Sequence, residues 1–412
     1  MVSLRYLDFV DLRYEPKDTD VVCTFHVEPD GISLKQAAGG VAAESSVGTW
    51  TELTTGKPYV EKLAAHVFSI KGSFVKIAYP IELFELGNMP NILSSVAGNV
   101  FGLRALKNLR LGDIRFPARL VESFKGPKFG IDGVRRLLGV YNRPLVGTII
   151  KPKLGLKTTD HARVAYDAWA GGCDIVKDDE NLSSQTFNPF EDRLTKTLES
   201  RDKAEEETGE RKVYMINVTA ETREMVKRAE SVLKHGGEYI MVDILTCGFS
   251  ALQTLRDQDF NLVIHAHRAG HAAFSKNPLH GISMRVISKV ARAVGVDQLH
   301  VGTVVGKMFE TKEEVAENCE ALKMLMHGLK PVLPVASGGL HPRLVPALVE
   351  FFGKDFAIQA GGGIHGHKDG TVAGAKAMRQ AVDAALKGIK LTEYAKAHNE
   401  LRRALETWPA SA

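Results

Sequence analysis

The sequence predicts an α/β protein, a (β/α)8 TIM barrel preceded by an α+β domain of the ferredoxin-like type. Two observations predict the barrel. From about residue 145 onward, eight short apolar runs alternate with amphipathic segments, and nearly every run ends in polar residues or glycine. The first 130 residues lack this regular alternation. We therefore expect an amino-terminal domain at residues 1–130 and a barrel domain with carboxyl-terminal helices at residues 131–412.

The amino-terminal domain is predicted to be one sheet with helices on a face. Branched and aromatic residues predict strands at residues 21–26, 66–69 and 74–78. Helices are expected at residues 34–43 and around residues 92–96.

Each barrel strand is predicted from a run of four to eight largely apolar residues, as expected for strands that are buried on both faces. Segments such as 222–229 and 284–291 place charged and apolar residues at helical spacing. No G-x-G-x-x-G follows the first run, which argues against a dinucleotide fold. The runs are Leu145–Ile150, Cys173–Val176, Lys212–Val218, Tyr239–Leu245, Asn261–His267, Gln298–Val305, Leu333–Ala336 and Phe356–Ala360.

An acidic cluster follows the second run, where Lys177 precedes Asp178, Asp179 and Glu180. The period of two along a strand puts Lys177 and Asp179 on one side. Taken alone, such a motif is more often a solvated turn. Because the carboxyl ends of barrel strands meet at one mouth, the cluster becomes a candidate site for a divalent metal.

Glycine pairs follow the seventh and eighth runs, where barrel enzymes commonly hold phosphate. Helix caps or turns are the alternative interpretation of each pair, but two pairs in the two expected loops favour phosphate binding. Cations at the same mouth fit a doubly anionic ligand. The glycines are Gly338, Gly339, Gly361 and Gly362, and the cations are Lys151, Lys153, Arg268 and Lys307.

The composition is ordinary for a globular protein, with 44% hydrophobic and 25% charged residues. No apolar run approaches the roughly 18 residues of a membrane span, and no secretory signal is apparent, so we expect a cytoplasmic protein without a membrane role. The four cysteines are scattered without a CxxC pair, which argues against a zinc site or a disulfide framework. A net charge of +4 without a basic stripe argues against a nucleic-acid partner.

Motifs along nearly the whole chain are similar to those of the large subunit of ribulose-1,5-bisphosphate carboxylase/oxygenase (RuBisCO), and they occur in that family's order. They are Glu44–Thr51, Gly98–Gly102, Gly147–Leu156, Gly171–Asn181, His267–His271, His300–Lys307, Ser337–Gly339 and Gly361–Gly363.

The resemblance implies carboxylation of D-ribulose 1,5-bisphosphate with CO2 and water to two 3-phosphoglycerate, through an enediolate. A competing reaction with O2 would give 3-phosphoglycerate and 2-phosphoglycolate. Lys177 would react with an activating CO2 to form a carbamate, which would bind Mg2+ together with Asp179 and Glu180. An ammonium cannot bind a cation, whereas a carbamate is an oxygen ligand of the kind that Mg2+ prefers.

The resemblance also implies roles for the other motif residues. Lys151 would be the acid/base of enolisation and of product protonation, with Lys153 in support and His267 assisting proton transfer. Lys307, on a mobile loop, would contact the added CO2. Arg268 and His300 would hold one phosphate and Ser337 the substrate backbone, while the other phosphate would contact Gly338, Gly339, Gly361, Gly362, Thr49 and Trp50.

Glu44 and Asn99 would reach the active site of a partner subunit, so a homodimer would be the smallest competent unit, with higher assembly of dimers open. Met308, Ile149 and the short chain resemble the archaeal or bacterial branch, form III-like, that has no small subunit. The chain departs from most relatives at Phe309-Glu310, where a glycine is usual.

Three alternatives remain. A RuBisCO-like enolase or isomerase of a related sugar phosphate would usually lack several of these residues. A non-catalytic phosphate-binding barrel would have no use for a complete acid, base and metal set. A generic Mg2+-dependent aldolase or enolase would share the barrel but not the Glu44 and Asn99 motifs.

Overall fold

The computed structural model describes residues 4–51 and 53–409, so the outermost residues of both predicted domains lie outside the described part. Two compact units are formed from Met1–Gly126, Gly270–Val294 and Met324–Leu329, and from Pro127–Ala269, Gly295–Lys323 and Lys330–Ala412. Each unit is made of three separate segments of the chain. The predicted division at residue 130 therefore stays a prediction. We describe each unit by itself.

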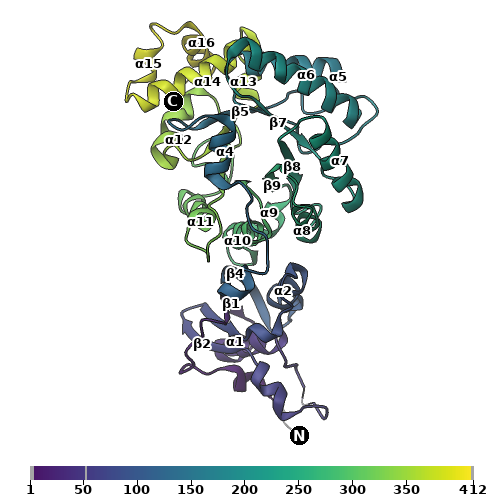
Figure 1. The fold of residues 1–412 in the computed structure, drawn as a ribbon. Coiled ribbons are helices and arrows are strands. Elements are labelled where there is room, and N and C mark those ends of the chain that lie inside the picture. The colour runs from purple at the N-terminus through teal and green to yellow at the C-terminus, as the bar shows by residue number, and fades with distance from the viewer. Residues whose placement is uncertain (1–3, 52, 410–412) are drawn as a thin grey trace. The chain divides into compact units, whose positions relative to one another are not determined.

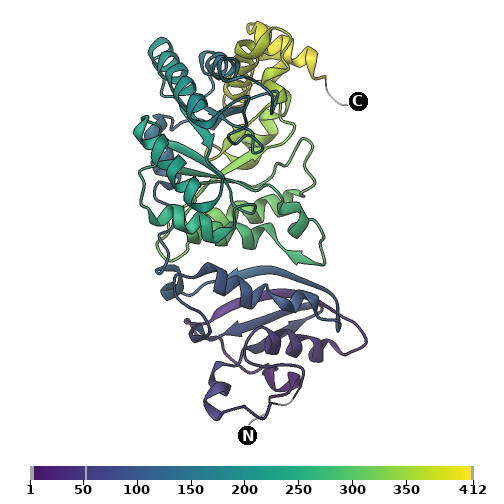
Figure 2. The ribbon, with the colours of Figure 1, turned by 90° about the vertical axis from the view of Figure 1, so that its right-hand side faces the viewer.

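The first unit contains an antiparallel sheet in the order β4-β1-β3-β2. With helices after β1 and β3 the chain runs βαββαβ, which is the predicted ferredoxin-like arrangement. Figure 2 shows these strands side by side in purple and blue. The bounds are β1 Val21–Pro29, α1 Leu34–Glu44, β2 His66–Lys71, β3 Phe74–Tyr79, α2 Met89–Val96 and β4 Leu106–Arg115.

Local sequence explains much of this unit. Buried and half-buried residues alternate along β1, as expected for a strand with one face on the core. Ser33 caps α1 by accepting a hydrogen bond from the Gln36 backbone, and the Gln36 side chain accepts one from the Ser33 backbone.

A fifth strand, β10 (Gly281–Ile282), pairs in parallel with β4 and was not predicted. Helix α10 (Met284–Val294) follows it, where a helix was expected. The Ser283 hydroxyl donates to the Gly112 carbonyl at 2.7 Å and joins this segment to the sheet. The shorter helices of the unit are η1 Tyr6–Phe9, η2 Pro58–Leu63, η3 Ile81–Leu83, η4 Asn99–Gly102, α3 Ala118–Val121 and α9 His271–Ser275.

The second unit contains a closed barrel of eight parallel strands, which confirms the predicted fold class. Each strand falls within or beside one of the predicted runs. Figure 1 shows helices α5 to α8 outside β5, β7, β8 and β9. The strands are β5 Leu145–Ile149, β6 Ile175–Lys177, β7 Val213–Asn217, β8 Tyr239–Asp243, β9 Val263–His267, β11 Gln298–His300, β12 Leu333–Ser337 and β13 Ala357–Gln359.

The helices of this unit cover the barrel and continue to the end of the described chain. They are α4 Gly130–Leu138, α5 Thr158–Ala170, α6 Phe190–Thr208, α7 Thr222–Lys234, α8 Phe249–Asp257, α11 Lys312–Lys323, η5 Pro342–Leu344, α12 Val345–Phe352, α13 Gly362–His365, α14 Gly370–Leu386, α15 Leu391–Tyr394 and α16 Asn399–Thr407. Among residues 4–51 and 53–409, no helix combines the length and apolar character needed to cross a membrane.

Helix α4 closes the amino-terminal end of the barrel. Its residues Ile131, Val134 and Leu138 belong to one buried cluster with inward-facing residues of the strands, among them Leu145 and Ile175. Apolar side chains fill the interior of the barrel at this end, whereas the predicted barrel site residues follow the opposite ends of the strands.

Candidate active site

The carboxyl end of β6 supplies the centre of the site. The Lys177 side chain is 1% exposed, and its ammonium lies 3.9 Å from a Glu180 carboxylate oxygen. The ammonium also donates a hydrogen bond of 2.7 Å to the Asp178 carbonyl. Burial lowers the pKa of Lys177, although the carboxylates of Glu180, Asp179 and Asp243 oppose this shift. Burial therefore favours the neutral amine, which is the nucleophilic form.

The Asp178 side chain points to the other side of the strand end, away from Lys177 and Asp179. Its carboxylate accepts hydrogen bonds from the Tyr214 hydroxyl at 2.6 Å and from Arg193 Nε at 3.1 Å, and it lies 3.2 Å from His161 Nε2. Burial acts to raise the pKa of Asp178, but Arg193 and His161 outweigh it and hold the pKa well below its usual range. Asp178 is thus a structural anchor between β6 and the surrounding helices.

Lys151, which follows β5, approaches the same cluster. Its ammonium donates a hydrogen bond of 2.7 Å to Asp179 Oδ2, and Asn181 Nδ2 donates one of 3.0 Å to Asp179 Oδ1. Burial acts to raise the pKa of Asp179, but the hydrogen bonds from Lys151 and Asn181 outweigh it and lower the pKa. Asp179 is therefore an anion at neutral pH.

His267, at the end of β9, lies between two carboxylates. Its Nδ1 is 2.9 Å from Asp243 Oδ1, and its Nε2 is 3.6 Å from Glu180 Oε2. Asp243 ends the neighbouring strand β8 in register with His267. The sequence assigns no role to Asp243, so its contact with the histidine is a structural finding.

A buried histidine pair lies beside His267. His300 Nε2 is 2.9 Å from His265 Nε2, and His265 Nδ1 is 2.9 Å from Gln298 Oε1. Burial, with the nearby His267 and His265, lowers the pKa of His300 well below its usual range. Burial and Lys177 lower that of His265 to about 3. Both rings are therefore neutral at physiological pH.

The loop after β11, which carries Lys307, lies against the end of β12. The Lys307 backbone N–H donates to the Gly338 carbonyl at 3.3 Å. A Cβ at Gly306 would lie 2.4 Å from that carbonyl oxygen, and a Cβ at Gly338 would lie 2.5 Å from Met308 Cγ. A Cβ at Gly339 would lie 3.1 Å from Lys307 Cγ. The glycines thus permit the two loops to approach closely.

The remaining predicted barrel residues follow their strands. Gly361 packs on Lys151, because a Cβ there would lie 2.9 Å from the Lys151 Cε. Ser337 ends β12 and Gly362 begins α13, while Lys153 is exposed. Arg268 follows β9, and its guanidinium forms a 2.5 Å ion pair with Glu310, a residue given no role from the sequence.

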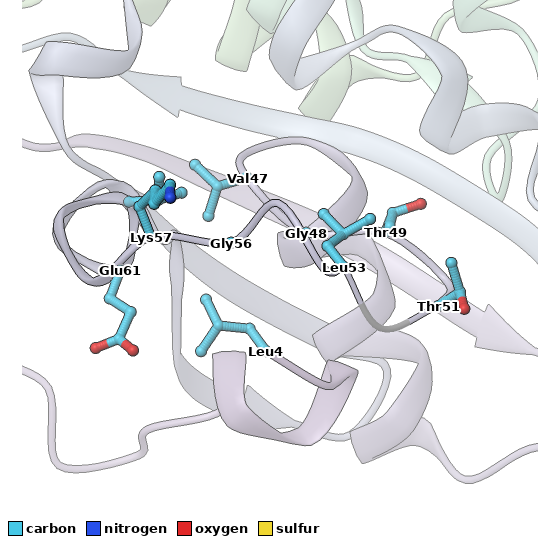
Figure 3. A pocket seen from close by; sticks show the side chains of 10 residues that line it. Leu4, Val47, Gly48, Thr49, Thr51, Leu53, Gly56, Lys57 and Glu61 are labelled. Atoms are coloured by element: carbon cyan, nitrogen blue, oxygen red, sulfur yellow. The ribbon is translucent and has the colours of Figure 1, made fainter. Parts of the chain in front are cut away.

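Four predicted site residues lie in the first unit. The Glu44 carboxylate, at the end of α1, accepts a 2.7 Å hydrogen bond from the Tyr6 hydroxyl. Asn99 begins η4, and Trp50 is 80% exposed. Thr49 lines a cavity of about 40 Å³, shown in Figure 3 with Thr51 on the same loop. This cavity has room for water but not for a sugar bisphosphate.

A polar cleft of about 510 Å³ lies at the other end of the barrel, beside α4. Its charged residues neutralise one another: Arg143 donates two hydrogen bonds to Asp174, and Arg379 pairs with Glu210. The predicted site residues of the barrel follow the carboxyl ends of its strands, at the opposite end, so this cleft is not the candidate site.

The oxygen donors at the mouth are too few to hold Mg2+ without a modified lysine. Among the described residues, no three His, Cys, Asp or Glu side chains form a metal-binding group. The carboxylates of Asp179 and Glu180 interact electrostatically with Lys177, which as an ammonium would repel a cation. Converting that amine into a carbamate would supply the missing oxygen ligand, so the residues fit a magnesium ion only together with the modified lysine.

The barrel and the lysines, acids and histidines at its mouth define an α/β-barrel enzyme. The family model described as "Ribulose bisphosphate carboxylase large chain, catalytic domain" matches residues 130–408. The model of the N-terminal domain of the same chain matches residues 8–120. The chain belongs to the ribulose bisphosphate carboxylase large chain family, as the motifs predicted.

Named relatives and solved structures agree with this assignment. The ribulose bisphosphate carboxylase of Methanocaldococcus jannaschii is 51% identical, covering 98% of this chain and 100% of that protein. The octameric RuBisCO of Pyrococcus horikoshii, solved with sulfate, has a TM-score of 0.96 at 49% identity, covering 100% of this chain and 99% of that one. The dimeric archaeal RuBisCO of Hyperthermus butylicus has a TM-score of 0.91 at 47% identity, covering 98% and 100%.

Proposed function

We propose that the protein catalyses the Mg2+-dependent carboxylation of D-ribulose 1,5-bisphosphate to two 3-phosphoglycerate, with oxygenation as a competing reaction. The observation that carries this proposal is the buried Lys177, whose ammonium lies 3.9 Å from Glu180, together with the hydrogen bond from Lys151 to Asp179. A lysine with a lowered pKa suits reaction with CO2, since only the neutral amine attacks it.

The metal would be held by Asp179, Glu180 and the carbamate of Lys177. When bound, Mg2+ supplies a Lewis acid that polarises the substrate carbonyl and stabilises negative charge. The proximity of Glu180 to Lys177 supports this assignment, and activating CO2 would be the second requirement.

Proton transfer is assigned to Lys151 and His267. Lys151 would take the proton during enolisation and later return one to the product carbanion, and the exposed Lys153 would support it. His267 would exchange protons with substrate hydroxyls, while Asp243, 2.9 Å from its Nδ1, fixes the orientation of the ring.

Phosphates would be held at two places around the mouth. Arg268 and His300 would bind one phosphate, and the close-packed loops of Gly338, Gly339, Gly361 and Gly362 would bind the other. Ser337 would contact the substrate backbone, and Lys307, beside the glycine loop, would meet the added CO2. Thr49 and Trp50 would complete the second phosphate site.

A homodimer is proposed as the smallest competent unit, with Glu44 and Asn99 acting at the partner's mouth. The dimeric and octameric assemblies named for the similar archaeal proteins support this and are compatible with dimers that assemble further. No small subunit, nucleic acid or membrane is proposed as a partner. The free cysteines, two of them buried, fit a reducing compartment, and we propose the cytoplasm.

The test is incorporation of labelled bicarbonate into 3-phosphoglycerate. Pure protein is preincubated with CO2 and Mg2+, supplied with ribulose 1,5-bisphosphate, and compared with a sample containing EDTA. Metal-dependent product is expected. No product from folded dimers would instead favour an enolase or isomerase of a related sugar phosphate.

A further inference from the structure

The pair of Arg268 and Glu310 joins two parts of the barrel mouth. Arg268 follows β9, whereas Glu310 is the last residue but one before α11. Their side chains are 5% and 3% exposed, and Arg268 Nη2 lies 2.5 Å from Glu310 Oε1. Burial lowers the pKa of Arg268, and the Glu310 carboxylate opposes that shift. Each charge therefore depends on the other for compensation.

The other amino group of Arg268, Nη1, is not engaged by Glu310. Among the described residues, the buried Arg268 Nη1 has no hydrogen-bond partner. A buried donor without an acceptor is costly, and a guanidinium presents its donors in a fixed planar fork. Once Glu310 holds Nη2, the direction of Nη1 is therefore set as well.

Glu310 lies between the capped start of helix α11 and Gly302. Thr311 and Glu314 cap α11 reciprocally, with the Thr311 backbone donating to Glu314 at 3.1 Å and the Glu314 backbone donating to Thr311 at 3.2 Å. Gly302 adopts φ +94° and packs on the ion pair, since a Cβ there would lie 3.1 Å from Glu310 Cδ and 3.2 Å from Arg268 Nη2. The pair is thus enclosed rather than a surface contact.

We propose that Glu310 is a positioning residue for substrate binding: it orients Arg268 so that Nη1 receives a phosphate, and it anchors the end of the loop that carries Lys307. The inference rests on the proposed function, because it takes Arg268 as a phosphate ligand. It assigns a role to the position where the chain departs from the usual glycine.

The role of Glu310 in orienting Arg268 can be distinguished from a role in which Glu310 only competes with phosphate for Arg268. A carboxylate that only neutralised Arg268 would weaken phosphate binding, and its removal would strengthen it. A carboxylate that orients Arg268 through Nη2 leaves Nη1 to the phosphate, so its removal weakens binding. Glutamine preserves an acceptor oxygen at the same place without the charge, and therefore distinguishes orientation from charge.

The first experiment is calorimetric titration of the full protein with inorganic phosphate at fixed ionic strength. Loss of one charge-assisted hydrogen bond in Glu310→Ala should weaken phosphate binding about tenfold. Glu310→Gln should bind as wild type or more tightly. Glu313→Ala, which removes an exposed carboxylate in the first turn of α11, is the matched control and should change nothing.

Kinetics of the same variants give the second readout. Glu310→Ala should raise KM for ribulose 1,5-bisphosphate and reduce carboxylation more than enolisation, whereas Glu310→Gln should restore KM. Unchanged or tighter phosphate binding in a folded Glu310→Ala variant, judged by its melting curve, overturns the inference alone. Absence of phosphate binding by the wild type overturns both the inference and the assignment of Arg268, while wild-type binding without any turnover counts against the proposed reaction only.

Discussion

The Lys151 ammonium donates a 2.7 Å hydrogen bond to Asp179 Oδ2, across the ends of neighbouring strands β5 and β6. The proposed general acid/base thus donates a hydrogen bond to a proposed metal ligand. Because one oxygen cannot serve an ammonium and a metal equally well, the lysine would compete with a bound metal for Asp179.

Replacing Lys151 with methionine should therefore separate metal binding from catalysis. Removing a competing charge-assisted hydrogen bond should tighten binding of Mn2+, used as a probe for Mg2+, by about tenfold. Enolisation should be lost. Electron paramagnetic resonance titration measures the first effect, and Lys157→Met, an exposed lysine before α5, is the control. Unchanged or weaker Mn2+ binding in Lys151→Met would argue that the pair does not compete with the metal.

Lys177→Ala should abolish activation by CO2 and Mg2+. Without the amine no carbamate can form, and Asp179 and Glu180 alone leave the metal a ligand short. Trapping of labelled CO2 on the protein measures this directly, with the exposed Lys196→Ala variant of α6 as control. Stoichiometric trapping of labelled CO2 on the Lys177→Ala variant would show that another lysine forms the carbamate.

Activation should rise with pH at constant dissolved CO2, since the reactive amine of Lys177 exists above its pKa. Asp243 raises the pKa of Lys177, so Asp243→Asn should lower it further and move the activation profile to lower pH. The extent of activation after preincubation at each pH measures the shift. Asp257→Asn, exposed at the end of α8, should leave the profile in place. A shift to higher pH in Asp243→Asn contradicts the assignment.

Lys307→Ala should spare enolisation and lose carboxylation, because Lys307 lies on the loop against Gly338 and Gly339 rather than among the acids. Exchange of the substrate C3 proton with solvent reports enolisation, and labelled product reports carboxylation. Equal loss of both steps would show that Lys307 acts earlier than proposed.

The anchor beneath the site can be tested through stability. Arg193→Met leaves the fully buried Asp178 carboxylate without its cation and should lower the free energy of unfolding by about 3–5 kcal/mol. Removing Arg403, whose pair with Asp369 is exposed to solvent, should lower the free energy of unfolding much less. Urea unfolding compares the two variants, and equal losses would show that the Asp178 pair is no more important than a surface contact. The pKa of Asp178 is lowered on folding, so its stabilisation is present at neutral pH and is lost only under strongly acidic conditions.

The barrel could be predicted because parallel strands buried on both faces appear as short apolar runs. Strand β7 is buried along its whole length, and its predicted run extends only one residue beyond each end. Strand β4 was missed, since charged residues such as Lys107 and Arg110 interrupt its pattern and irregular pairing with β1 disturbs the alternation. The two residues of β10 become a strand only by pairing with β4, far away in sequence.

Features of the candidate site that depend on consecutive residues can be predicted from the sequence. Contacts that depend on the pairing of distant strands cannot. The strand alternation that separates Lys177 and Asp179 from Asp178 is a property of consecutive residues. Contacts such as those of His267 with Asp243, and of Arg268 with Glu310, join different strand ends and loops. Each partner carries an ordinary charge in the sequence, and only the folded barrel shows which charges meet.

Consecutive residues at the end of β6, from Lys177 to Asp179, point to opposite sides of the strand. Lys177 and Asp179 are the residues proposed to act at the mouth, while Asp178 ties the strand to helix α6 through Arg193 and to strand β7 through Tyr214. A slip of one residue would exchange these duties, turning an anchor toward the substrate and a reactive amine toward the helices. The contacts of Asp178 therefore fix the register of this strand end, so that the side chains of Lys177 and Asp179 are directed toward the mouth of the barrel.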